Sequence, residues 1–261
     1  MAILCGGRGT RLRERTKEIP KPLVEIGGMP IVWHVIRLYA VQGFERFLLA
    51  TGYKGEMIER FVAEQRWPPG VTVECVDTGL QTQTGGRIER LRGRLHGEER
   101  FCVTYADGVA DIDLGALLDF HADHGALATM TVVRPELQFG VTELGDDGSV
   151  VGFREKPRSE HWINGGFFCF DRGALEYLDS DSVLEREPLE RLAADGALKA
   201  YRHEGFWECM DTYKDAVALA DMWAAGEAPW RLWEADGEDP RAAGPAPAGA
   251  ASAAVESRRT G

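Results

Sequence analysis

The chain has 261 residues, 44% of them hydrophobic, and a formal net charge of −12. This length allows one large α/β domain or two small ones. The acidic balance excludes a protein that holds nucleic acid on a basic surface. No apolar run approaches the roughly 20 residues that span a bilayer, and the N-terminus lacks the pattern of a secretory signal. We therefore expect a cytoplasmic protein with neither a membrane nor a nucleic-acid partner.

Short apolar runs alternate with amphipathic segments through the first half of the chain. Strands are predicted at residues 2–5, 47–51, 71–76, 101–104 and 126–133, and helices at 30–39, 55–63, 86–95 and 113–121. Strands that alternate with helices favour a mostly parallel sheet with helices on both faces. The predicted fold class is α/β, with a Rossmann-like sheet flanked by helices.

The pattern changes after Arg134. Strands are predicted at residues 139–142, 150–155 and 162–170, with few helices between them, which indicates a small β-rich part. Helical segments are predicted at 172–178, 188–194 and 213–224, and a short strand at 206–208. Residues 235–261 are rich in Ala, Gly and Pro and lack periodicity. We predict a domain over residues 1–234 and a disordered tail over 235–261.

A glycine-rich loop with Gly6, Gly7 and Gly9 directly follows the first buried strand. Glycines let backbone N–H groups approach phosphate oxygens closely, although a plain turn between a strand and a helix has the same composition. The loop fits neither a Walker A motif nor a dinucleotide fingerprint. Lys21 follows between two prolines, which predict an extended, rigid backbone. A fixed lysine beside a phosphate loop can neutralise developing charge; the alternative is a solvated surface lysine.

The loop ends in Gly-Thr-Arg-Leu and is followed by Pro-Lys-Pro-Leu-Val at residues 20–24. This combination resembles the signature of sugar-phosphate nucleotidyltransferases, and the resemblance extends to about residue 225. It implies the nucleotide-diphospho-sugar transferase fold, with the β-rich part binding the sugar. Further motifs resemble glucose-1-phosphate cytidylyltransferases, at residues 77–79, 84–87, 104–109, 153–157, 162–168, 187–189 and 205–207. Such enzymes make CDP-glucose and pyrophosphate from CTP and glucose 1-phosphate.

The resemblance assigns two groups of residues to the nucleoside triphosphate. Arg11 is expected to stabilise the leaving pyrophosphate, and Lys21 the charge at the α-phosphorus. The remaining nucleotide-binding residues are expected to surround the phosphates and the base, with either Gln81 or Gln83 reading the base edge: Gly6, Gly7, Gly9, Thr10, Gln81, Gln83, Thr84, Gly85 and Gly86.

Two aspartates are candidates for a Mg²⁺ site. Asp107 comes just after the strand at 101–104, at the carboxyl edge of the sheet where α/β proteins bind ligands. Asp211 precedes the closing helix. Mg²⁺ prefers carboxylate and phosphate oxygens, and the resemblance implies that both residues hold the metal. Taken singly, Asp107 could be a turn residue and Asp211 a helix N-cap. Asp113 is predicted to be an N-cap.

The matching sugar-phosphate site comprises Gly140, Glu155, Lys156, Asn164 and Gly165. The resemblance implies that Lys156 grips the phosphate, that Glu155 and Asn164 bind sugar hydroxyls, and that the glycines allow close approach. An exposed charged turn is the alternative at Glu155 and Lys156.

Compared with that family, the segment from residue 64 to residue 76 is short. In the family this region lies near the nucleotide and the subunit contacts, and a homo-oligomer is expected. Two alternatives stay open: the same chemistry with UTP, dTTP or another sugar 1-phosphate, and a non-catalytic subunit that senses nucleotide sugars.

Overall fold

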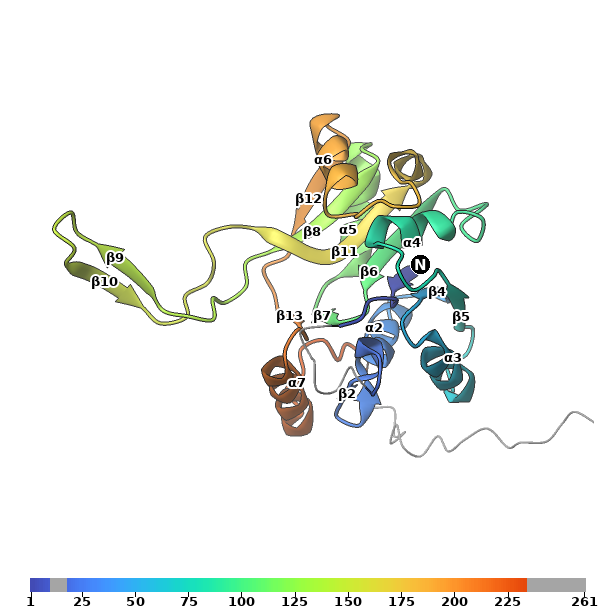
Figure 1. Cartoon of the computed structure of the whole chain (residues 1–261), viewed down its shortest axis with the longest axis horizontal. Helices are drawn as coiled ribbons and strands as arrows, with labels where there is room; N and C mark the ends of the chain where they lie inside the picture. The colour runs from blue at the N-terminus through green and yellow to red at the C-terminus, as the bar shows by residue number, and fades with distance from the viewer. Residues whose placement is uncertain (10–17, 234–261) are drawn as a thin grey trace, which may run out of the picture.

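The computed structural model describes residues 1–9 and 18–233. Its central sheet has seven strands in the order β12–β8–β11–β6–β1–β4–β5 (Figure 1). Strand β11 is antiparallel to its neighbours β6 and β8, and the other adjacent pairs are parallel. The predicted mostly parallel α/β sheet is therefore confirmed. The strands are β1 (Ala2–Leu4), β4 (Arg46–Thr51), β5 (Thr72–Asp77), β6 (Arg100–Tyr105), β8 (Ala128–Val133), β11 (Ile163–Asp171) and β12 (Leu198–Arg202).

Helices cover both faces of the sheet. Neighbouring side chains of a strand point to opposite sides, and the central strands have apolar side chains on both sides, so each face needs a covering layer. On one face, Ile3 and Leu49 pack in a core cluster with α2 (Ile31–Ala40), α3 (Gly55–Glu64), α5 (Leu114–His124) and α7 (Tyr213–Ala225). On the other face, Leu4 and Leu48 pack with α4 (Thr84–Arg90), the 3₁₀ helix η3 (Arg172–Tyr177) and α6 (Glu187–Ala194). The predicted two-sided arrangement is confirmed.

Local sequence fixes the ends of α5. The Asp113 side chain accepts a hydrogen bond from the Ala116 N–H and caps the helix, as predicted. Gly125 ends it with a left-handed backbone at φ 65°, a conformation that glycine adopts without steric cost. The helix predicted at 86–95 is shorter, since α4 ends at Arg90 and turns follow.

Several short elements differ from the prediction. The strand expected at residues 139–142 is β9, two residues later at Val141–Leu144, and the segment at 172–178 forms a 3₁₀ helix. Strand β12 was missed because charged side chains interrupt it, and its pairing with β8 defines it. Also new are η2 (Lys21–Leu23), β2 (Glu25–Ile26), β3 (Met29–Pro30) and β7 (Gly108–Ala110), and the strand expected at 206–208 is β13 (Trp207–Cys209).

The β-rich part is an arm, defined here as residues 134–162, that leaves the sheet between β8 and β11. Its outer end is a two-stranded antiparallel ribbon of β9 and β10 (Val150–Arg154). Figure 1 shows this ribbon projecting from the body. Within the described residues, no helix is both long and apolar enough to cross a bilayer. The predicted tail at 235–261 lies outside those residues.

A buried histidine anchors the last described turns. The His34 Nε2 atom lies 2.9 Å from the Ile26 carbonyl oxygen and donates to it, and Trp230 Nε1 lies 3.4 Å from Nδ1. His34 and Trp230 are both 0% exposed. The ring is therefore held neutral, with Nε2 as the protonated nitrogen.

Folding stability should depend on the protonation of His34. Burial lowers its pKa to about 4, whereas an unfolded chain titrates near 6.5. The unfolded state therefore binds the proton more readily between these values. The contribution of neutral His34 to the free energy of unfolding is complete above pH 6.5, and up to about 3 kcal/mol of it is lost as the pH falls toward 4. Urea unfolding across this pH range measures the free energy of unfolding. In His34→Gln the dependence should flatten, and in the exposed control His161→Gln it should persist; equal slopes would contradict the assignment.

Candidate active site

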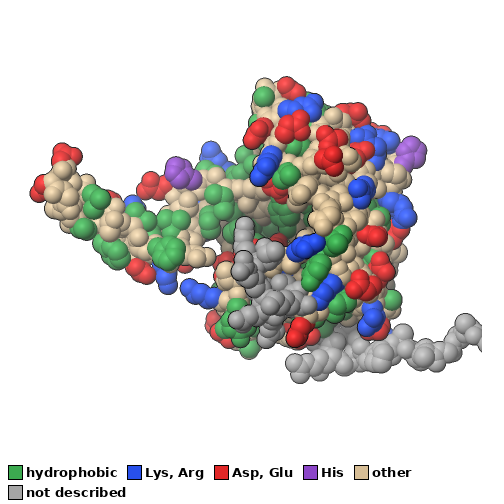
Figure 2. Space-filling model, viewed as in Figure 1, with side chains coloured by type: hydrophobic (Ala, Val, Ile, Leu, Met, Phe, Trp, Pro, Cys, Tyr) green, Lys and Arg blue, Asp and Glu red, His purple; other side chains and the backbone are tan. Residues whose placement is uncertain are grey.

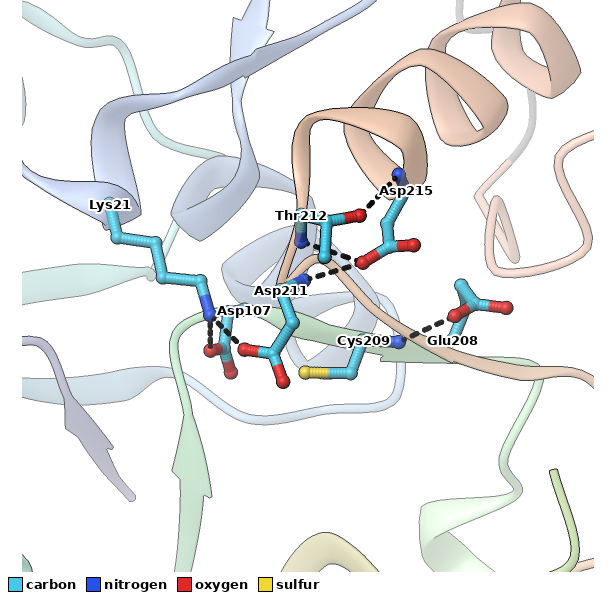
Figure 3. Close-up of polar contacts among 7 residues, drawn as sticks. All are labelled: Lys21, Asp107, Glu208, Cys209, Asp211, Thr212 and Asp215. Carbon is cyan, nitrogen blue, oxygen red and sulfur yellow. Dashed lines mark hydrogen bonds and ion pairs between the residues drawn. The ribbon is translucent and has the colours of Figure 1, made fainter. Parts of the chain in front are cut away.

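Pairing between two short strands brings the two predicted metal aspartates together. Strands β7 and β13 run antiparallel, with Cys209 opposite Gly108. Asp107 immediately precedes β7, and Asp211 follows β13 by two residues. The Met210 N–H also donates to the Asp107 carbonyl oxygen at 2.9 Å. The two aspartates are 104 residues apart in sequence, yet their side chains meet at the carboxyl edge of β6 (Figure 3).

The backbone at Lys21 differs from the prediction. Lys21 begins the 3₁₀ turn η2, so its backbone is not extended. The Leu23 N–H donates to the Pro20 carbonyl oxygen at 2.9 Å and the Val24 N–H to that of Lys21 at 3.0 Å. These bonds close a turn that the prolines alone do not specify. The predicted rigidity holds, because Pro22 is buried and the turn is hydrogen-bonded.

The Lys21 ammonium joins the two carboxylates. Its Nζ lies 2.5 Å from Asp107 Oδ2 and 2.7 Å from Asp211 Oδ1 (Figure 3). Burial alone would lower the Lys21 pKa, but the charge of Asp107 and hydrogen bonds to both aspartates outweigh it and raise that pKa. With its side chain 13% exposed, Lys21 is a fixed cation and not a solvated surface lysine.

Asp211 is not the N-cap of α7, so that alternative is wrong. Thr212 caps the helix by accepting from the Asp215 N–H, and the Asp215 carboxylate accepts from the Thr212 N–H. Asp215 also accepts from the Asp211 N–H at 3.0 Å. This capping box fixes the backbone of Asp211 and leaves its carboxylate directed at Lys21 (Figure 3).

Within the described residues, the side chains grouped closely enough to share a metal are Asp107, Cys209 and Asp211, whose ligand atoms lie within 4.8 Å of one another. Cys209 offers a soft sulfur, which suits metals other than Mg²⁺, and burial and the charge of Asp107 raise its pKa. Two hard carboxylates then dominate the donor set. This composition fits Mg²⁺, which prefers oxygen ligands.

The first strand leads into the glycine loop. The Gly6 carbonyl oxygen accepts from the Tyr53 N–H at 3.2 Å, and a side chain at Gly6 would overlap the Arg87 guanidinium. Gly9 has a φ of 59°, which disfavours other residues. A Cβ at Gly7 would meet no atom of residues 1–9 or 18–233 within 4 Å, so packing against these residues does not require glycine there. Thr10 and Arg11 lie outside the described residues.

Arg87 ties this loop to two other strand ends, a role that the sequence analysis missed. Its side chain is buried and donates to the carbonyl oxygens of Thr51 at 2.8 Å, Gly79 at 3.0 Å and Gly6 at 3.0 Å, and to Thr78 Oγ1 at 2.6 Å. These acceptors follow or end β4, β5 and β1. Burial lowers the Arg87 pKa, but a guanidinium still stays charged.

Packing accounts for the glycines that open α4. A Cβ at Gly85 would lie 2.7 Å from Ser182 Cβ, and one at Gly86 would overlap the Ser180 carbonyl oxygen. Thr84 Oγ1 donates to Glu185 at 2.6 Å. The first turn of α4 is thus fastened to residues 180–185. Gln81 and Gln83 are both exposed beside this turn, and their relation to the base stays a prediction.

The Asn164–Gly166 segment of β11 lies against the end of β6, where the Gly166 carbonyl oxygen accepts from Thr104 Oγ1 at 2.9 Å. Asn164 Oδ1 accepts from the Gly166 N–H at 2.8 Å, and its amide lies 3.5 Å from the Tyr105 hydroxyl. Gly166 has a φ of 82°, and a Cβ there would lie 2.7 Å from the Tyr105 ring. Gly165 accepts from Trp207 Nε1 at 2.7 Å. Glu185 also accepts from the Tyr105 hydroxyl, so Glu185 links the α4 turn to this segment.

The other predicted sugar-phosphate residues lie on the arm. Glu155 and Lys156 are exposed and follow β10, and Lys156 has a left-handed backbone with φ 43°. Gly140 lies beneath the Phe153 ring, which a Cβ at this position would overlap. A non-glycine residue with positive φ costs energy and often marks a functional segment. Among the described residues, the hydrogen bonds of Lys21 Nζ are with Asp107 and Asp211 and not with Gly140, Glu155 or Lys156.

Comparison with known proteins identifies the class of protein that this fold and site define. Residues 1–215 match the family "Nucleotidyl transferase", and the chain belongs to that family. Similar proteins include the glucose-1-phosphate cytidylyltransferase of Salmonella typhi, 42% identical over 256 residues, with 89% of this chain and 98% of the relative covered. The probable glucose-1-phosphate cytidylyltransferase of Bacillus subtilis is 40% identical over 252 residues, covering 88% and 98%.

A solved structure supports the fold. HddC from Yersinia pseudotuberculosis superposes with a TM-score of 0.68 at 21% identity, covering 85% of this chain and 98% of that protein. The alignment with the Salmonella typhi enzyme has 256 positions, which is more than the 89% of this chain that it covers. Part of that enzyme therefore has no counterpart in this chain. A shortened segment was predicted before Asp77, where α3 reaches β5 through residues 65–71 only.

Proposed function

We propose that this chain transfers the CMP group of CTP to glucose 1-phosphate and releases pyrophosphate, giving CDP-glucose. The observation that carries the proposal is the Lys21 ammonium held between Asp107 and Asp211. The two cytidylyltransferases that are 40–42% identical support the choice of CTP and glucose 1-phosphate. We place the reaction in the cytoplasm, where nucleoside triphosphates are available.

The reaction is a single in-line displacement. A phosphate oxygen of glucose 1-phosphate forms a bond to the α-phosphorus of CTP as the bond from that phosphorus to the pyrophosphate oxygen breaks. The attacking phosphate is already ionised, so no general base is required. Lys21 stabilises charge at the α-phosphorus, Arg11 the leaving pyrophosphate, and Lys156 the attacking phosphate. Positioning and charge neutralisation supply most of the catalysis in such transfers.

Asp107 and Asp211 are the residues that would hold Mg²⁺. When bound, Mg²⁺ supplies positive charge that offsets the charge of the phosphate oxygens. The Lys21 ammonium compensates the two carboxylates, which keeps the like charges close together at little cost. Among the described residues, its Nζ is bonded to these two aspartates, so a metal on the carboxylates would leave the ammonium available to the nucleotide.

Pyrophosphate release from a matrix of nucleoside triphosphates and sugar 1-phosphates tests the proposal. CTP with glucose 1-phosphate should give the highest kcat/KM, by at least about tenfold over UTP or dTTP, which corresponds to roughly 1.4 kcal/mol in the transition state. Chelation with EDTA should abolish release, and added Mg²⁺ should restore it. A preference for UTP or dTTP would overturn the cytidylyl assignment. No release from any pair would favour the sensing subunit.

A further inference from the structure

The Glu185 carboxylate joins two parts of the candidate site that are far apart in sequence. Its Oε2 atom accepts from the Thr84 hydroxyl at 2.6 Å, and its Oε1 atom accepts from the Tyr105 hydroxyl. Thr84 begins α4, and Tyr105 ends β6 two residues before Asp107. Each carboxylate oxygen therefore serves one side of the candidate site.

The backbone that carries Glu185 is held in place. The Leu184 N–H donates to Thr84 Oγ1 at 2.9 Å, and the Gly86 N–H donates to the Ser182 carbonyl oxygen at 3.0 Å. Leu184 is buried in the core between the sheet and the helices α4 and α6, which lie on the same face (Figure 1). The Glu185 side chain is exposed, but it starts from a fixed position.

The direction of each hydrogen bond follows from the groups that form it. An ionised carboxylate only accepts, so the Tyr105 hydroxyl proton points to Glu185. The phenol oxygen then presents its lone pairs to the Asn164 amide nitrogen, which lies 3.5 Å away. The Asn164 amide oxygen accepts from the Gly166 N–H at 2.8 Å. Both contacts require the same orientation of the amide, with its nitrogen toward Tyr105 and its oxygen toward Gly166.

The contact between Asn164 and Tyr105 depends on Glu185. A distance of 3.5 Å is at the long end for a hydrogen bond, so the contact is easily lost. Without Glu185 the hydroxyl proton is free to turn toward Asn164, where it would meet the hydrogens of the amide. The Tyr105 ring is fixed in either case, because a Cβ at Gly166 would lie 2.7 Å from it and the Phe168 ring packs edge-on against it at 6.0 Å. Glu185 therefore controls the direction of the proton and not the place of the ring.

We propose that Glu185 is a positioning residue, which acts through the Tyr105 hydroxyl to fix the Asn164 amide for the sugar 1-phosphate. The inference rests on the proposed function, in which Asn164 binds the sugar. An asparagine amide has two N–H donors and two oxygen lone pairs. The described hydrogen bonds of Asn164 within residues 1–9 and 18–233 use one of each. The other N–H and lone pair suit sugar hydroxyls, which both donate and accept.

The chain contains a single asparagine, so the amide can be observed directly. In protein made with ¹⁵N-labelled asparagine, the side-chain NH₂ signal belongs to Asn164. Its exchange with water should be about tenfold faster or more in Glu185→Ala and in Tyr105→Phe, which corresponds to the loss of one hydrogen bond. Glu185→Gln should be intermediate, because its amide oxygen can still accept from Tyr105.

Kinetics of pyrophosphate release with CTP test the consequence for the sugar. Misplacing a bound reactant by about 1 Å can cost about 100-fold in rate. Glu185→Ala and Tyr105→Phe should each raise the KM for glucose 1-phosphate by about tenfold or more, and Tyr105→Phe should leave the KM for CTP nearly unchanged. The double variant should be no worse than Glu185→Ala, because both changes interrupt the same contact.

The matched control is an acidic residue of the helix that follows. Acidic side chains are spread over the body (Figure 2), and Glu190 is an exposed one on α6. Glu190→Ala removes an equal charge and should leave both the amide signal and the KM for glucose 1-phosphate unchanged. Circular dichroism must show that each variant is folded.

Three results would overturn the proposal. One is an Asn164 signal that exchanges equally slowly in Glu185→Ala and in the wild type, whatever the activity. The second is faster exchange with an unchanged KM for glucose 1-phosphate, and the third is a double variant whose losses add. The labelling needs no turnover: a wild type that is inactive with every pair, but whose Asn164 signal shifts when glucose 1-phosphate is added, refutes the proposed transfer alone. An inactive wild type without that shift overturns both.

Discussion

Replacing Lys21 by methionine is expected to lower turnover by about 10²–10³-fold, the range found when one preorganised group that stabilises transition-state charge is removed. Methionine keeps much of the side-chain volume but has no charge. The ammonium that lies 2.5–2.7 Å from Asp107 and Asp211 is then missing when charge develops at the α-phosphorus. Initial rates of pyrophosphate release at saturating CTP and glucose 1-phosphate measure the loss.

Two comparisons make this result specific. Lys199→Met removes an equal charge from the exposed strand β12 and should leave turnover unchanged. Lys21→Arg keeps the charge but replaces a compact ammonium with a broad planar group, and should recover only part of the rate. Far-UV circular dichroism must show that each variant is folded. Nearly full turnover in Lys21→Met would refute the role given to Lys21.

The second large effect is expected at Arg87. Arg87→Met should destabilise the fold by about 3 kcal/mol or more, because several buried acceptors lose their donor and each costs about 1–3 kcal/mol. It should also raise the KM for the nucleotide by about tenfold or more, since the carbonyl oxygen of Gly6 is no longer tied to the ends of β4 and β5. Urea unfolding gives the first quantity, and kinetics at a temperature where the variant is folded gives the second.

The control is the next arginine of the same helix. Arg90 is exposed and donates to the Thr78 carbonyl oxygen at 2.6 Å. Arg90→Met should therefore cost about 1 kcal/mol, as for one ordinary hydrogen bond, with little change in KM. Arg87→Lys should be intermediate, because one ammonium cannot reach all of the acceptors. If Arg87→Met unfolds more easily but binds the nucleotide normally, Arg87 stabilises the fold without positioning the loop.

Much of the fold could be predicted because its signals are local. The β1, β4 and β6 strands are short apolar runs, and α2, α3 and α7 have helical spacing with clear starts. Asp113, as an N-cap residue, predicted the start of α5. Among the elements that were missed, β7 and β12 are short or interrupted by polar residues, and they are defined by the strands that pair with them.

In the candidate site, too, some residues have a local sequence signal and others are defined only by partners far away in the sequence. The loop glycines, Lys21 and the two aspartates were identified from motifs, and their types indicated phosphate and metal chemistry. Arg87 lies within the motif at residues 84–87, but the sequence gives it no role, since an arginine in a helix is usually solvated. Nothing in its own neighbourhood shows that Gly6, 81 residues earlier, lies against its guanidinium.

The class of chemistry follows from the sequence, because motif residues must be present in the chain whatever its conformation. The Lys21 ammonium shared by Asp107 and Asp211 follows from the fold, because the antiparallel register of β7 and β13 sets the distance between the two carboxylates. The fold also places Lys156 on the arm, with exposed apolar side chains of β9 and β10 beside it. Alternation along β9 and β10 becomes a face only when the register aligns Leu144 with Val150.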